Sequence, residues 1–201
     1  SRHAAPMMIE RDAGLIVDGT EAGVVFGPQH AEEWDGLRIG ASAVGVSLAG
    51  LSVRGTTGGV RVDGADVFVG GLAVDGASAG CGLTLVGGAR LAEGSAGVTV
   101  SGAGSWSVCA ETGTADSLPA EASAYTGNTE DGIFLQGSVI AESVTWENLG
   151  VPYVVSDTVD VGGTAGEPAV LTITEGVTVQ FERDRGLRFS RTGAASALHV
   201  L

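Results

Sequence analysis

One short stretch of the sequence formally matches a catalytic signature. Residues 76–80 read Gly-Ala-Ser-Ala-Gly, the G-x-S-x-G pattern that presents a nucleophilic serine in hydrolases. That signature needs a strand before the serine, a helix after it, and a histidine and an acid downstream. Here Ser78 falls in a glycine-rich corner that leads into another apolar segment. The sequence therefore predicts no nucleophilic catalysis by Ser78.

The other candidate groups are dispersed along the chain. Paired acids lie in expected loops or near strand ends, and the histidines are scattered; the groups are Glu32 with Glu33, Glu130 with Asp131, Asp157 with Asp160, and His3, His30 and His199. Asp-Gly pairs follow apolar segments at 18–19, 63–64 and 75–76 and are typical of turns. A row of calcium sites is the alternative interpretation, but the calcium-binding nonapeptide of other β-solenoids is absent. We expect no metal and no cofactor.

Composition limits the fold and the partners. Glycine makes up 34 of 201 residues, which argues against a helical bundle because glycine costs about 1 kcal/mol per helical position relative to alanine. Ten arginines face 24 carboxylates, a net charge of −14, so nucleic acid is not an expected partner. No apolar run reaches the 18 to 20 residues of a membrane span. No run at the N-terminus of this segment resembles a secretion signal.

A repeat of 21 to 23 residues organises the chain. Apolar-x-apolar triplets begin at positions 15, 37, 60, 83 and 106, at steps of 22, 23, 23 and 23. A second row runs through Val24, Val46, Val67 and Ala89, and a third joins 51–53 to 72–74 and 98–100. Three short strands per coil, separated by glycine corners such as 49–50 and 70–71, predict an all-β, right-handed parallel β-helix. Inward rows should form columns of Val, Leu and Ile. We expect 1–201 to be a single domain, a piece of a longer protein.

The repeat lapses over residues 110–131 and strands resume at 133–135. We expect this segment to be a loop excursion from one face, because long loops are where binding surfaces tend to lie. A solvated insertion without a ligand is the alternative.

Five side chains are candidates for ligand contact. Arg38 and Arg61 lie 23 apart, so they should stack on the outer face of one sheet, beside Thr84 and Ser107 of the same row. The others are Trp34, Tyr125 and Trp146, which lie in or beside expected loops and could stack on a sugar ring, whereas Trp106 should be inward. A solvated sheet face and tryptophans that cover a sheet end are the alternatives.

Cys81 and Cys109 are 28 apart, five more than one coil, so simple stacking does not bring their Cα atoms within the roughly 7 Å that a disulfide needs. An irregular path after Val108 could bring Cys109 back. Both a bonded pair and two free thiols remain open.

Residues 9–15 reappear as 181–187 at an offset of 172, with five of seven residues identical. Either the intervening block is one unit of a larger array, or coils of like composition match by chance. We also expect uncapped strand edges at the ends, and with them end-to-end self-association.

With this repeat in view, the chain resembles bacterial secreted and surface proteins with right-handed parallel β-helix repeats, pectate-lyase-like in the broad sense. The resemblance rests on 34–39, 145–155 and 171–181. It implies export to the periplasm, the cell surface or the medium, with polysaccharide or another surface protein as partner. Lyases of this kind cluster calcium-binding aspartates near an arginine or a lysine, and the related polygalacturonases cluster aspartates with a histidine. Neither cluster is found in this sequence.

The sequence thus favours a non-enzymatic surface scaffold or a module for adhesion or carbohydrate binding. A polysaccharide lyase or glycoside hydrolase module and a self-assembling stalk or filament unit are the alternatives, since this architecture hosts all of them.

Overall fold

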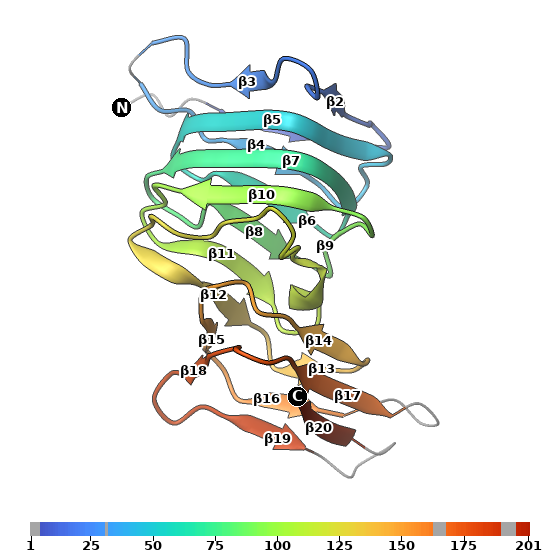
Figure 1. Ribbon diagram of the computed structural model, residues 1–201. Coiled ribbons are helices and arrows are strands. Elements are labelled where there is room, and N and C mark those ends of the chain that lie inside the picture. Colours follow the sequence, from blue (N-terminus) through green and yellow to red (C-terminus); the bar gives the residue numbers. More distant parts are fainter. Residues whose placement is uncertain (1–4, 31, 163–167, 190–195) are drawn as a thin grey trace.

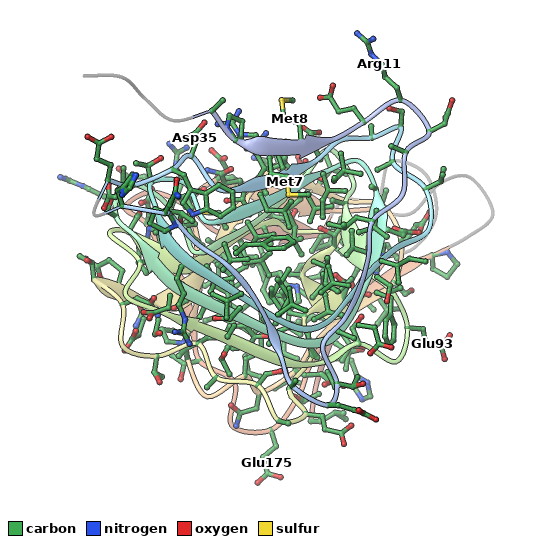
Figure 2. The ribbon with its side chains drawn as sticks, turned by 90° about the horizontal axis from the view of Figure 1, so that it is seen from above. Met7, Met8, Arg11, Asp35, Glu93 and Glu175 are labelled. Atoms are coloured by element: carbon green, nitrogen blue, oxygen red, sulfur yellow. A yellow bond between two sulfur atoms is a disulfide. The ribbon has the colours of Figure 1, made fainter. Side chains whose placement is uncertain are left out.

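The computed structural model describes residues 5–30, 32–162, 168–189 and 196–201. The chain forms an all-β parallel solenoid of about seven turns, which confirms the predicted fold class. The coils are stacked from the N-terminal coil at the top of Figure 1 to the C-terminal coil at the bottom. Seen down the stack, they lie over one another and surround a core of apolar side chains (Figure 2).

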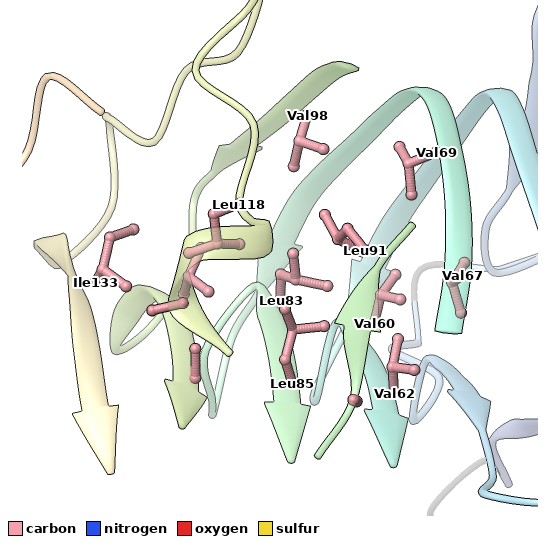
Figure 3. Packing of buried hydrophobic residues seen from close by; sticks show 14 of the residues in the cluster. Val60, Val62, Val67, Val69, Leu83, Leu85, Leu91, Val98, Leu118 and Ile133 are labelled. Carbon is pink, nitrogen blue, oxygen red and sulfur yellow. The ribbon is translucent and has the colours of Figure 1, made fainter. Parts of the chain in front are cut away.

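One face of the solenoid is an eight-stranded parallel sheet. Its strands, in spatial and chain order, are β1 (Met7–Ile9), β4 (Leu37–Ile39), β6 (Val60–Asp63), β8 (Leu83–Val86), β11 (Trp106–Glu111), β12 (Glu130–Gln136), β15 (Tyr153–Val155) and β18 (Val179–Phe181). Leu37, Val60 and Leu83 are successive register partners and fully buried. Figure 3 shows Val60 and Leu83 of this column inside the stack. The predicted column is confirmed.

In the N-terminal half, a six-stranded sheet forms the rest of the wall. Its strands are β2 (Ile16–Asp18), β3 (Val24–Phe26), β5 (Val46–Thr56), β7 (Asp66–Ala77), β9 (Arg90–Leu91) and β10 (Ala96–Ser101). The expected second and third strands of a coil are here one continuous strand, β5 or β7. These strands bend at Gly50 and Gly71, where φ is +63° and +98°, a conformation that glycine adopts without a side-chain clash.

The C-terminal half has the three separate short strands that the repeat predicts. Besides the eight-stranded sheet, it contains two three-stranded parallel sheets: β13 (Val139–Ile140), β16 (Val159–Val161) and β19 (Leu187–Phe189), and β14 (Val144–Trp146), β17 (Ala169–Ile173) and β20 (Ser196–Val200). The chain therefore keeps one solenoid path while its corners change from glycine bends to loops.

The first coil departs from the rows expected from spacing. The first-row partner of β4 is β1, not 15–17, and β3 pairs with Leu51–Val53 in the third row rather than with Val46. Met7 and Leu37 are register partners 30 residues apart, because a polar segment lengthens this coil. A constant step of about 22 residues therefore placed 15–17 in the first row instead of the second, and Val24–Phe26 in the second row instead of the third.

The row through Trp106 is also corrected. Val108, not Trp106, is the partner of Leu83, and a register irregularity separates Trp106 from Val108. Trp106 consequently lies half-buried, stacked on Phe134 with ring centroids 5.4 Å apart, instead of inside. Ser107, expected to face outward, is fully buried.

Residues 110–131 interrupt the regular strands but do not leave the stack. After a single 3-10 turn, η1 (Ala115–Ser117), the chain runs alongside β10. There Ala124 N–H donates to Val98 O at 2.9 Å and Val100 N–H donates to Ala124 O at 2.9 Å. The expected excursion is therefore an irregular coil of the solenoid rather than a projecting loop.

Cys81 and Cys109 form a disulfide, with Cα atoms 5.9 Å apart. Cys109 remains within β11. The shift of that strand, which pairs Cys109 with Thr84, moves it two positions from the register that the repeat predicts and toward the corner that holds Cys81. No free cysteine remains among the described residues.

Candidate binding site

Two arginines lie side by side on the outer face of the eight-stranded sheet. Arg38 of β4 and Arg61 of β6 are register partners, and Met8 of β1 continues the row above them. Neighbouring strands are about 4.8 Å apart, so the two guanidinium groups project from adjacent rungs. The outward direction follows from strand alternation, because the residues on either side of each arginine are in the core.

Each arginine is held by one carboxylate. Arg38 Nη2 donates to Asp35 Oδ2 at 2.9 Å, and Arg61 Nη2 donates to Asp63 Oδ2 at 3.3 Å. Thr57 Oγ1 donates to the other oxygen of Asp35 at 2.9 Å, which fixes that carboxylate. The arginine side chains remain 46% and 41% exposed. A guanidinium carries five N–H donors, so each group has donors beyond the one that its carboxylate uses.

A shallow groove of about 390 Å³ contains this pair. It is lined by Met8, Glu10, Arg38, Ile39, Gly40, Ala41, Arg61 and Asp63. Its floor is apolar and backbone, while its cations are paired with only one acid each. Such a site can form bidentate hydrogen bonds with an added carboxylate at the free edge of either guanidinium.

The predicted stripe continues differently below Arg61. Thr84 is its register partner, as expected, but Cys109 and Phe134 follow in the row because of the shift of β11. The stripe of cations and hydroxyls is therefore limited to Arg38, Arg61 and Thr84.

The three aromatic candidates are not gathered at this groove. Tyr125 and Trp146 are buried, at 1% and 0% exposure, so neither ring is open to a ligand. Trp146 stacks on Tyr153 with centroids 5.3 Å apart. Trp34 is half-buried and donates from Nε1 to Arg54 O at 2.9 Å. The expectation of exposed rings at Tyr125 and Trp146 is wrong, because both belong to the core.

The buried tyrosines serve the core as hydrogen-bond donors. Tyr125 OH donates to Pro119 O at 2.8 Å and Tyr153 OH donates to Glu147 O at 2.9 Å. Burial raises the pKa of both phenols above the ordinary value of 10. They are uncharged wherever the protein is folded at neutral pH.

The described acids do not form a metal-binding cluster. Within the described ranges, no group of three or more His, Cys, Asp or Glu side chains is placed to hold a metal ion. Ser78 Oγ donates to Glu33 Oε2 at 2.8 Å, so the partner of this serine is a carboxylate and not a histidine. His30 and His199 are exposed and distant in the fold, and His3 lies outside the described residues.

Sequence reasoning missed a second groove of about 400 Å³ over the bend of β5 and β7. Its outer row consists of small side chains, Ser52, Ala73 and Thr99, which are successive register partners, and Arg54 lies at its edge. The third row of the repeat already joins these strands, at offsets of 21 and 26, and the pairing of β7 with β10 confirms that the longer step is one coil.

These features define the class of protein: a parallel β-solenoid with a paired-arginine groove on one sheet face. No family model matches the chain, and neither a curated protein nor a solved structure is significantly similar to it. None of the described residues forms a helix with the length and apolar character of a membrane span.

Proposed function

We propose that the chain is a non-enzymatic, exported surface scaffold that binds acidic polysaccharide. The observation that supports this most is the pairing of Arg38 with Arg61 on adjacent rungs of a rigid sheet. Successive uronate carboxylates along a polysaccharide could each meet one guanidinium, and both cations already have one partner that fixes their orientation. The resemblance to exported bacterial β-helix proteins supports the location and the ligand class.

The overall charge limits how such a ligand approaches. A net charge of −14 repels a long polyanion, while the two arginines attract it locally. Short acidic oligosaccharides should therefore bind more tightly than long chains of the same sugar. Moderate salt should reduce this difference, because it screens the long-range repulsion more than the direct contacts.

The test is calorimetric titration with oligogalacturonates of four to six units. We expect the double variant R38A/R61A to lose at least tenfold in affinity, while R54A/R188A, with the same change in charge on other faces, keeps the wild-type affinity. Equal binding by both variants, or binding of neutral oligosaccharides alone, would contradict the proposal.

The alternative of a lyase or hydrolase needs several carboxylates converging in a groove on one sheet face. The paired-arginine groove is lined by two, Glu10 and Asp63. Release of new reducing ends or unsaturated uronates from the same oligosaccharides would support this alternative.

A further inference from the structure

The two ends of the solenoid carry most of its exposed large apolar side chains. Of those among the described residues, four belong to β1, β2 or β3 and four to residues 179–201, against three elsewhere. β1 and β18 are the edge strands of the eight-stranded sheet. Open edges with apolar side chains are surfaces on which another strand can pair.

The last coil repeats the first coil strand by strand. When 172 is added to the residue numbers of the first coil, β1 coincides with β18 and β3 begins at the same residue as β20. Shifted in the same way, β2 differs from β19 by one residue. The seven-residue match is therefore the most similar part of a correspondence that extends over a whole coil.

The corner that carries the match is closed by the same hydrogen bond in both copies. Ala13 N–H donates to Glu10 O at 3.2 Å, and Arg185 N–H donates to Glu182 O at 3.1 Å. Asp12 and Asp184 both have left-handed backbones, with φ of +61° and +60°. Arg11, before Asp12, is also left-handed, at +58°, whereas Arg183 is not. Since residues other than glycine rarely adopt this conformation, its recurrence at the two aspartates argues against a chance match.

The backbone groups at the two open edges alternate in the phase that pairing requires. Met7 N–H and Ile9 O are bonded to the coil below, so Met8 turns its own N–H and C=O to the top edge, seen from above in Figure 2. Thr178 O and Glu182 N–H face β15, so Val179 and Phe181 turn theirs to the bottom edge. A strand whose middle residue faces upward thus fits one whose outer residues face downward, as in every internal pair.

The side chains at the edges continue the core columns. Phe181 and Leu198 are inward residues, partners of Val155 and Leu171, and are 44% and 46% exposed because no described coil lies beyond them. Shifted by 172, they correspond to Ile9 and Phe26, which are inward residues of the first coil. The column of one molecule could therefore continue into that of the next.

We propose that a second copy of this chain stacks on the open end, its β1, β2 and β3 adding below β18, β19 and β20 of the first. The bottom edge of one copy and the top edge of the next match in the order of their strands, in backbone phase and in their inward columns, so a second copy is the occupant that this geometry fits. The contact is heterologous and does not close, so repetition gives a filament. The proposal is independent of ligand binding at Arg38 and Arg61.

Charge sets the conditions for assembly. The stacked register brings Glu10 near Glu182 and Asp12 near Asp184, and each copy carries a net charge of −14. Screening of this repulsion should favour association. The apparent mass should therefore rise with protein concentration, and more steeply in 0.5 M salt than in 0.05 M salt. The reason is that the Debye length falls from about 14 Å at the lower salt concentration to about 4 Å at the higher one.

Two blocking variants test the head-to-tail contact by sedimentation velocity. M8P removes an N–H that faces only the top edge, and L198K places a charge at the bottom edge. We expect each alone to remain at the 19.9 kDa of one chain, and their equimolar mixture to form dimers of twice that mass, because each supplies the end that the other lacks. V139K is the matched control, since Val139 is 55% exposed away from both ends, and it should assemble like the wild type.

Circular dichroism of each variant shows whether it is folded. A wild-type chain that stays monomeric at high concentration in 0.5 M salt would overturn the proposal. So would dimers of M8P alone or of L198K alone, because these indicate contacts between like ends.

Discussion

At the scale of single residues, a column of glycines sets how closely the coils approach. Gly36, Gly59 and Gly82 stack at the corner before the eight-stranded sheet, where Leu37 N–H donates to Gly59 O at 3.0 Å and Val60 N–H donates to Gly82 O at 2.9 Å. A Cβ on Gly59 would collide with the Gly82 carbonyl oxygen. The corner thus excludes side chains for a packing reason as well as for its φ of +67°.

Replacement of Gly59 by alanine should therefore be far more costly than the same change at Gly45. Gly45 also has a positive φ, +62°, but nothing lies within 4 Å of a Cβ there. We expect G45A to lower the free energy of unfolding by about 1–2 kcal/mol and G59A by about 2–5 kcal/mol, from backbone strain plus overpacking. Urea denaturation followed by tryptophan fluorescence measures both, and equal losses would contradict the packing argument.

At the scale of elements, side chains replace the missing strands in the irregular coil 110–131. Asn128 Nδ2 donates to Val100 O and to Ser107 Oγ, each at 3.0 Å, and its Oδ1 accepts from Ala103 N–H at 3.0 Å. Its backbone N–H donates to Asp131 Oδ1, which holds the pKa of that carboxyl below its usual value. One asparagine thus joins this coil to β10 and β11.

N128A should lower the free energy of unfolding by about 2–3 kcal/mol, because it leaves backbone groups of the core unsatisfied. The matched control is N148A, since Asn148 makes a local bond to Gly150 N–H at an exposed site. That control should cost less than 1 kcal/mol, by an order-of-magnitude estimate for exposed sites. Hydrogen exchange should show the loss of protection at the Ala103 N–H, which donates to Asn128 Oδ1, in N128A alone; a loss spread evenly over the chain would count against this role.

Sequence reasoning found the strands whose apolar residues alternate and missed this coil, because Asn128, Ser117 and Ser123 satisfy the neighbouring backbone without such alternation. It placed Trp146 and Tyr125 in or beside loops for a related reason. A lone aromatic residue has no periodic partner in the sequence, and only the stack shows that both rings fill the core.

At the scale of the whole molecule, the two tyrosines of the chain report on the integrity of the core. Both are buried, in different coils, and both phenols have raised pKa values. A raised pKa contributes stability that is complete below the unfolded value of about 10 and is lost as pH rises through the folded value. The stack should therefore unfold at alkaline pH.

Absorbance at 295 nm measures this directly. We expect the folded protein to show no tyrosinate as pH passes 10, and then to gain the signal of both phenols together with the loss of circular dichroism. In denaturant the two should titrate independently near pH 10, by the reference value for exposed tyrosine. Titration of either phenol before unfolding would show that its coil opens by itself.

The sequence alone determined that the chain winds as a parallel solenoid, because each coil repeats the same inward apolar positions and these must stack to be buried. It also determined that Arg38 and Arg61 would be neighbours, since they lie one regular coil apart. Only the tertiary structure decided the register where coils change length, and with it the row of β1, the outward position of Trp106 and the pairing of the cysteines. A period fixes which residues point inward, whereas the length of each coil depends on bends, loops and side-chain hydrogen bonds that have no period.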